Sequence, residues 1–225
     1  MSKLSILSNS ISRKNLMALT GLFLCLFLVI HLAGNLQLLL PEERAATQYN
    51  FYSELLSHNF LIKFISYALY LSILVHVIDA IILTYQNWRA RGAQGYVYDR
   101  RRKASSWYSR NMGLLGALIF VFLVIHLKDF WFQYKFGTMA MDAEGHKDIY
   151  TIVVALYQDP LYVGIYVISL LVLGFHLLHG FSSAFESLGL YHTRYSKWMK
   201  AFGWIYTIAI TGGFIIIPLL VYFFK

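Results

Sequence analysis

The sequence predicts an all-α integral membrane protein, with five transmembrane helices packed into one bundle. Of its 225 residues, 58% are hydrophobic and only 13% are charged, whereas about half of a typical soluble domain is apolar. Five apolar stretches also reach the roughly 20 residues that a helix needs to cross a bilayer. These stretches are residues 17–40, 60–85, 112–134, 161–185 and 201–224. Little sequence remains for a soluble unit, so we expect residues 1–225 to form a single transmembrane domain.

The first apolar stretch, residues 17–40, is too long for a secretory signal and lacks a small-residue cleavage site. We therefore expect it to remain in the protein as the first transmembrane helix. It contains the one cysteine of the chain, Cys25. No internal disulfide can form, and no zinc or iron–sulfur site can be built from several cysteines.

The net charge of +8 is divided unevenly between the two sides that alternating helices define. One side carries most of the basic residues: Lys3, Arg13, Lys14, Arg89, Arg91, Arg100, Arg101, Arg102, Lys103, Arg110, Arg194, Lys197 and Lys200. The other side carries an excess of acidic residues: Glu42, Glu43, Glu54, Asp142, Glu144, Asp148 and Asp159. By the positive-inside rule, the amino terminus is cytoplasmic and the carboxyl terminus is outside. The same distribution indicates contact with anionic membrane lipid, and not with nucleic acid.

Three further segments are expected to play structural roles. Residues 49–58 and 148–157, in the two outer connections, are mildly amphipathic, which is typical of short helices that lie in the membrane interface. Residues 201–224 contain neither a histidine nor a charged residue. We expect this last stretch to be a packing helix.

Four histidines lie inside four different predicted helices: His31, His76, His126 and His176. An imidazole in the bilayer is costly without a partner, so intramembrane histidines indicate function. Neutral imidazole is also a common axial ligand of haem iron. One such histidine alone is more often a hydrogen-bonded contact between helices, but four of them, one on each helix, favour a cofactor.

The depths of these histidines agree in pairs. His31 and His126 each lie about 21 Å from the inner start of a helix that runs outward, at 1.5 Å per residue. His76 and His176 each lie about 23 Å from the outer start of a helix that runs inward. The first pair therefore belongs to the outer half of the membrane and the second pair to the inner half.

Each level thus offers two histidines from non-adjacent helices, which is what a bis-histidine haem requires. We expect the bundle to enclose two b haems, separated in depth by roughly 12 Å. Nε2 of each histidine would bind iron, and Nδ1–H would donate to the carbonyl one turn earlier. Small residues near the ligands, Gly34, Ala80 and Gly180, would let the flat cofactor approach.

Some assignments near the two levels stay open. His179 lies three residues after His176 on nearly the same helix face, so either one could ligate iron. We favour His176, which leaves His179 as a neighbour of a haem propionate or a quinone. Asp79 could serve a proton path or pair with a basic residue, and Lys128 and Asp129 could simply pair with each other.

Haem propionates favour basic partners, and several basic residues are placed for this role at the inner side. They are Arg13, Lys14, Arg89, Arg110 and Arg194. For any single arginine among them, contact with anionic lipid or a role in topology is the simpler explanation.

The chain resembles a known family, the dihaem cytochrome b membrane-anchor subunit of succinate dehydrogenase and fumarate reductase (succinate:quinone oxidoreductases), in its single-chain, five-helix form. The resemblance covers nearly the whole chain. It is carried by residues 31–35 (His-Leu-Ala-Gly-Asn), His76, His126, and Phe175-His176 followed by Gly180 and Ser183. It implies that the four histidines ligate two b haems in the pairing given above, and it supports His176 over His179.

The resemblance also implies partners and a location. An iron–sulfur subunit, bound to a flavoprotein that interconverts succinate and fumarate, would dock on the cytoplasmic face of a bacterial inner membrane. Electrons would pass through the two haems to or from a quinone, commonly menaquinone, near the outer haem. Glu54 and His58 are candidates for quinone proton exchange, although plain interface polarity would explain them equally well. Whether such heterotrimers pair into a dimer is left open.

One position departs from part of this family. Some fumarate-reducing members have a glutamate two residues before the fourth-helix histidine, where this chain has Gly174. That difference favours a succinate dehydrogenase. The chain contains no nucleotide loop or nucleophile arrangement, so we do not expect it to be the dicarboxylate catalyst itself.

Two other functions are compatible with the histidines. A dihaem b subunit of another membrane oxidoreductase, such as a hydrogenase or a formate dehydrogenase, also places histidines in several helices. A haem-free histidine transporter or proton channel would require a continuous polar path, whereas these helices are apolar around isolated histidines.

Overall fold

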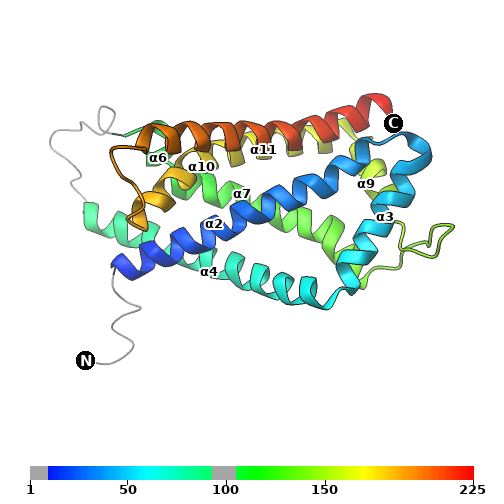
Figure 1. Cartoon of the computed structure of the whole chain (residues 1–225), viewed down its shortest axis with the longest axis horizontal. Coiled ribbons are helices and arrows are strands. Elements are labelled where there is room, and N and C mark those ends of the chain that lie inside the picture. The colour runs from blue at the N-terminus through cyan, green and yellow to red at the C-terminus, as the bar shows by residue number, and fades with distance from the viewer. Residues whose placement is uncertain (1–9, 93–104) are drawn as a thin grey trace.

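The computed structural model describes residues 10–92 and 105–225, and the regular secondary structure of this part is almost entirely helical. Figure 1 shows long helices lying side by side, with shorter helices at both ends of the bundle. Five of the basic residues that support the predicted orientation lie outside the described residues. They are Lys3, Arg100, Arg101, Arg102 and Lys103.

Five helical segments are long and apolar enough to cross a membrane, which confirms the predicted all-α, multi-pass class. They are Ile11–Leu39, Phe60–Arg91, Met112–Phe136, Pro160–Ser187 and Ser196–Phe224. The first combines α2 (Ser10–Asn35) with the 3-10 turn η1 (Leu36–Leu39), and the second, fourth and fifth are α4, α10 and α11. The third combines α7 (Met112–His126), the π-helix η2 (Leu127–Phe132) and α8 (Gln133–Phe136).

Polar residues set several of the helix starts. Asn59 accepts a hydrogen bond from the backbone N–H of Ile62 at the start of α4. Asp159 caps α10 in the same way and is followed by Pro160, whose fixed φ suits the first helical position. A short helix, α6 (Trp107–Arg110), precedes α7 and is capped by Ser106. These caps fix where α4, α6 and α10 begin.

The two amphipathic outer runs form helices, α3 (Glu42–His58) and α9 (Ile149–Tyr157). Helix α3 begins seven residues earlier than the predicted run, because Pro41 precedes it and its first turn carries two glutamates, which favour a helix start. Both helices pack near η1, α10 and α11, where the largest buried apolar cluster of the described chain lies. That cluster is Leu38, Ile149, Val153, Tyr157, Val163, Tyr166, Ile217 and Val221.

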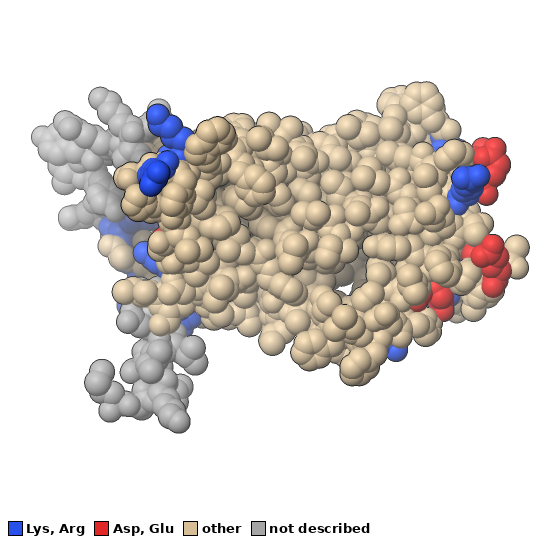
Figure 2. Space-filling view, in the orientation of Figure 1, with Lys and Arg blue, Asp and Glu red and all other residues tan. Residues whose placement is uncertain are grey.

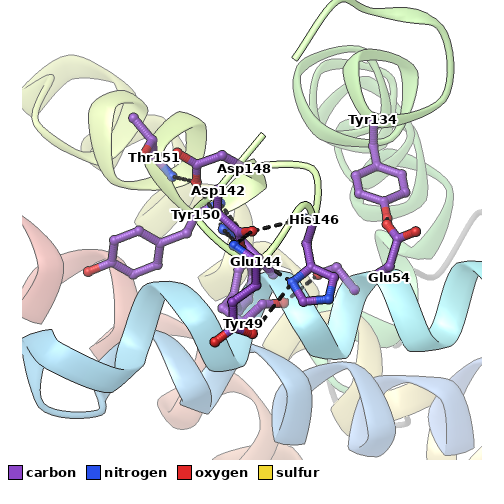
Figure 3. A network of polar contacts seen from close by, with 11 residues as sticks. Tyr49, Glu54, Tyr134, Asp142, Glu144, His146, Asp148, Tyr150 and Thr151 are labelled. Carbon is purple, nitrogen blue, oxygen red and sulfur yellow. Dashed lines mark hydrogen bonds and ion pairs between the residues drawn. The ribbon is translucent and has the colours of Figure 1, made fainter. Parts of the chain in front are cut away.

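A short hairpin between α8 and α9 is attached to α3 through the buried side chain of Asn50. Its amide donates to Asp142 (3.3 Å) and Asp148 (3.1 Å), and its oxygen accepts from the backbone N–H of Tyr150 (3.0 Å). Figure 3 shows this network between the hairpin and α3. The hairpin is therefore held by three hydrogen bonds to one fully buried side chain.

Hydrogen bonds also lower the pKa of both aspartates of this network. Burial by itself raises the pKa of Asp142, but the backbone N–H of His146 and the amide of Asn50 outweigh it. Burial likewise raises the pKa of Asp148, and the hydroxyl and backbone N–H of Thr151 outweigh it together with Asn50. Both carboxylates are thus stabilised in their charged form.

Helix α11 packs closely on α10 and α2, as a packing helix should. A Cβ at Gly213 would lie 2.8 Å from a methyl carbon of Leu32, and one at Gly203 would lie 3.1 Å from the ring of Phe181. The hydroxyl of Tyr206 donates to the carbonyl of Cys25 on α2 (2.7 Å). Glycine therefore lets α11 approach both neighbours where a larger side chain would collide.

Charged side chains gather at the two ends of the bundle. In Figure 2, lysine and arginine cluster at the end where α2 begins, while aspartate and glutamate cluster at the opposite end. The apolar sides between them fit a surface that faces lipid. The assignment of the basic end to the cytoplasm stays a prediction.

Candidate functional site

The middle of the bundle contains one large cavity of about 2070 Å³. Ligand pockets of drug-sized molecules measure about 300–1,000 Å³, so this space is large enough for two such groups. Its wall comes mainly from α2, α4, α7 and α10, whereas α11 contributes only Phe214 and Ile217 among the described residues. Figure 2 shows an opening in this face of the bundle, above α4 in the shared orientation.

All four predicted ligand histidines face this cavity, and they meet in the predicted pairs. The ring centroids of His31 and His126 are 5.8 Å apart, and those of His76 and His176 are 6.4 Å apart. A metal ion binds an imidazole nitrogen at about 2 Å, and that nitrogen lies about 1.1 Å from the ring centroid. Two imidazoles on opposite sides of one metal ion therefore have centroids roughly 6 Å apart. Both pairs therefore have the spacing that one metal ion between two imidazoles requires.

Glycines opposite the inner pair show how far apart the two levels lie. A Cβ at Gly21 of α2 would be 3.4 Å from Cε1 of His76, and one at Gly116 of α7 would be 3.8 Å from Cε1 of His176. On each of these helices the outer histidine lies ten residues further along. Ten residues of α-helix rise about 15 Å, close to the predicted separation.

The Nδ1 atom of His76 lies 3.1 Å from Oγ1 of Thr20 on α2. The Thr20 hydroxyl has one proton, and the carbonyl of Leu16 is its nearest acceptor at 2.8 Å. When that proton is donated to Leu16, the oxygen accepts from Nδ1–H of His76. The lone pair of Nε2 is then left for a ligand, as the sequence predicts, although the partner is a hydroxyl and not a carbonyl.

The other histidines differ in how Nδ1 is held. Nδ1 of His31 lies 3.4 Å from the amide nitrogen of Asn35, which also donates to the His31 carbonyl (2.8 Å). Nδ1 of His126 lies 3.1 Å from the hydroxyl of Tyr166. Nδ1 of His176 is buried and makes no hydrogen bond to the described residues. In none of these three contacts does Nδ1 donate to the backbone carbonyl one turn earlier.

Arg13 and Asp79 form an ion pair beside the inner level (2.9 Å). Asp79 is buried, and its second oxygen, like Nε of Arg13, has no partner among the described residues. Of the two roles expected for Asp79, a proton path or pairing with a basic residue, the structure shows the pairing with a basic residue. Lys128 and Asp129 also pair as expected (3.2 Å).

The remaining candidates for propionate contact lie at different places. Lys14 and His179 line the cavity, whereas Arg89 and Arg110 are not among its lining residues. The Arg89 guanidinium lies over the ring of Tyr85 (5.8 Å), and Arg110 donates to the carbonyl of Ser105. The ring of His76 lies next to the ring of His176, and no ring contact between His76 and His179 is found among the described residues.

Glu54 and His58 lie together at the outer end of the cavity. Oε1 of Glu54 is 2.9 Å from Nδ1 of His58, and Oε2 accepts from the hydroxyl of Tyr134 (3.1 Å). Figure 3 shows the Tyr134 phenol directed at Glu54. Tyr134 lines the cavity, so the Glu54 carboxylate is connected to it through the Tyr134 hydroxyl, which also lies 3.3 Å from Oγ of Ser57.

The small residues do not all serve the cavity. Ala80 and Gly180 line it, but a Cβ at Gly34 would lie 2.7 Å from the ring of Tyr52 on α3. The expectation for Gly34 is therefore wrong, because α3 folds back against this glycine. A Cβ at Gly174 would lie 3.3 Å from Oγ1 of Thr211 on α11, so a side chain at this position would be crowded by α11.

The residues present fit two bis-histidine haems. The ring spacings suit one metal ion per pair, and glycines of α2 and α7 lie against the inner rings. The cavity also joins both pairs along one side of four helices.

Two residues that contact the histidines, Thr20 and Tyr166, are not predicted from the sequence. Their identification depends on how each helix is rotated about its axis, which depth along the chain does not give. One signal was present for the outer level: Tyr162 and Tyr166 are four residues apart, and therefore on one helix face.

Comparisons of the chain with family models, with curated proteins and with solved structures found no match. The assignment of a function therefore rests on the residues and on the geometry of the cavity.

Proposed function

We propose that this chain is the membrane-anchor and electron-transfer subunit of a succinate:quinone oxidoreductase. Two histidine pairs, stacked along one cavity inside the apolar helices, carry this proposal. His31 and His126 would hold an outer b haem, and His76 and His176 would hold an inner one. When bound, the haems supply one-electron transfer between the iron–sulfur subunit and a quinone.

The chain's own residues would then position each haem and separate it from water. Thr20 holds His76, and Tyr166 holds His126, so that each presents Nε2 to the cavity. Apolar side chains make up most of the wall between the two levels. Lys14 and His179, at the inner end of the cavity, are available to inner-haem propionates.

A quinone, menaquinone by the family resemblance, would react near the outer haem. Glu54, His58 and Tyr134 form a connected polar group at that end of the cavity, with Tyr134 on its wall. Such a group can exchange protons with a quinone whose ring enters from the lipid. The basic end of the bundle would face the cytoplasm, where its charge suits a soluble partner complex.

The test is purification of the full-length chain from the membrane in which it is made, followed by assay of succinate-dependent quinone reduction. We expect copurification with a flavoprotein and an iron–sulfur protein, and slower quinone reduction in Glu54→Gln. Glu144→Gln, on the nearby hairpin, is the matched control. Copurification with the catalytic subunit of a hydrogenase or a formate dehydrogenase would instead assign the chain to that class.

A further inference from the structure

We propose that Asp129, Tyr162 and Tyr166 form a hydrogen-bonded chain that orients His126 and strengthens it as a ligand. This inference rests on the proposed function, because it concerns the histidine that would bind the outer haem. It assigns a role to Asp129 beyond its pairing with Lys128, and to two tyrosines of α10.

The three side chains connect to His126 without a gap. Oδ2 of Asp129 accepts from the Tyr162 hydroxyl at 3.0 Å, and the hydroxyl oxygens of Tyr162 and Tyr166 are 3.1 Å apart. The Tyr166 hydroxyl is 3.1 Å from Nδ1 of His126. Each of these distances is within the range of a hydrogen bond.

The number of protons fixes the direction of the chain. An ionised carboxylate only accepts hydrogen bonds, so Tyr162 donates its single proton to Asp129. The Tyr162 oxygen then accepts from Tyr166, whose own proton is thereby used. The Tyr166 oxygen is left to accept from Nδ1–H of His126. Nε2 therefore carries no proton and faces the cavity as a lone pair.

Packing holds the two tyrosines in place. Their rings stack with centroids 4.7 Å apart at an interplanar angle of 28°. Tyr166 is only 3% exposed and also packs edge-on against Phe122 (4.9 Å) and Tyr157 (5.4 Å). Because the rings are fixed, their hydroxyls are in position before any ligand is bound.

The backbone at Asp129 is unusual as well. The π-helix η2 (Leu127–Phe132) begins directly after His126 and contains Asp129. Helical turns of this kind are rare and occur frequently at functional sites. A carboxylate within a membrane-spanning segment is itself costly and indicates function. The Asp129 side chain is 16% exposed, whereas the adjacent Lys128 is 75% exposed.

The inner level differs in a way that makes the effect specific. The Thr20 hydroxyl, which accepts from His76, donates to the neutral carbonyl of Leu16 and not to a carboxylate. A carboxylate at the far end of a hydrogen-bonded chain makes an imidazole a stronger ligand. Stronger donation favours ferric over ferrous iron, so the chain lowers the potential of the outer haem.

The test is an optical redox titration of the full-length chain in its membrane complex, with the variants Tyr162→Phe and Asp129→Asn. A variant without the inner pair identifies the outer haem. We expect a roughly tenfold loss of ferric preference at the outer haem alone, a positive shift of about 59 mV for one electron. Tyr162→Phe changes no charge, so a shift in this variant requires the hydrogen bonds themselves.

The matched control is Tyr222→Phe, which removes a hydroxyl from a partly buried tyrosine of α11 and should move neither haem. Both haems bound with an unmoved outer potential in Tyr162→Phe would overturn the inference, and so would an equal shift of both haems. Absence of haem from the unaltered protein would instead contradict the proposed function.

Discussion

Thr20 and His76 join two helices at the inner level of the cavity, with Oγ1 of Thr20 lying 3.1 Å from Nδ1 of His76. The contact links α2 to α4 and fixes which ring nitrogen faces the cavity. The Thr20 hydroxyl donates to the carbonyl of Leu16, one turn earlier, and has His76 as its second partner.

Thr20→Val removes the acceptor for Nδ1–H of His76 and keeps the shape of the side chain. Loss of such a supporting contact typically costs a metal site about 10- to 100-fold in affinity. We expect weaker haem binding at the inner level and unchanged binding at the outer level, measured by haem content after titration. Thr20→Ser should restore binding, and a valine variant with normal inner-haem affinity would contradict the assigned role.

Gly21→Val should close the space against the inner imidazole. A Cβ at position 21 would already lie 3.4 Å from Cε1 of His76. The two methyl groups of a valine there would have no room beside a bound cofactor. We expect loss of the inner haem only, seen as half the haem content of the unaltered protein. Gly164→Val, where a Cβ meets nothing within 4 Å, is the control and should retain both haems.

Arg13→Leu should destabilise the fold, because it leaves Asp79 buried without its counter-charge. Asp79 has a side chain that is 4% exposed, against 24% for Arg13. Breaking one partner of a buried pair costs about 3–5 kcal/mol, whereas replacing both partners by apolar residues can be neutral. Thermal unfolding in detergent should therefore show a larger loss for Arg13→Leu than for the double variant Arg13→Leu/Asp79→Leu.

The outer hairpin should loosen in acid. The pKa values of Asp142 and Asp148 lie below their ordinary value, which is about 3.9 in an unfolded chain. Their contribution to stability is therefore complete above that value and is lost as the pH falls through the lower, folded-state values. Hydrogen exchange of residues 137–158 should rise in this window, and Asp142→Asn with Asp148→Asn should flatten the dependence.

Hydropathy and length predict the five long helices well, because the bilayer requires a continuous apolar stretch whatever the packing. The helices extend beyond the apolar stretches at the basic end, where α4 continues to Arg91 and α11 begins at Ser196. Polar residues do not end a helix there, since the backbone hydrogen bonds continue regardless of side-chain polarity.

The pairing of the histidines also follows from depth, but the contacts around them do not. The rotation of α2 about its axis brings Thr20 against His76 and Gly34 against Tyr52. Neither rotation nor crossing angle is encoded in the spacing of histidines. The π-helix after His126 likewise has no simple signal in the residues. The supporting contacts of the site therefore required the structure.

The most direct test of the central claim is a dithionite-reduced minus oxidised absorbance spectrum, with haem counted per chain. Two low-spin b haems are expected in the unaltered protein. One should be lost when His31 or His126 is replaced by alanine, and the other when His76 or His176 is replaced. Absence of haem would contradict the account and leave a haem-free transporter; a single haem would show that one histidine pair serves another purpose.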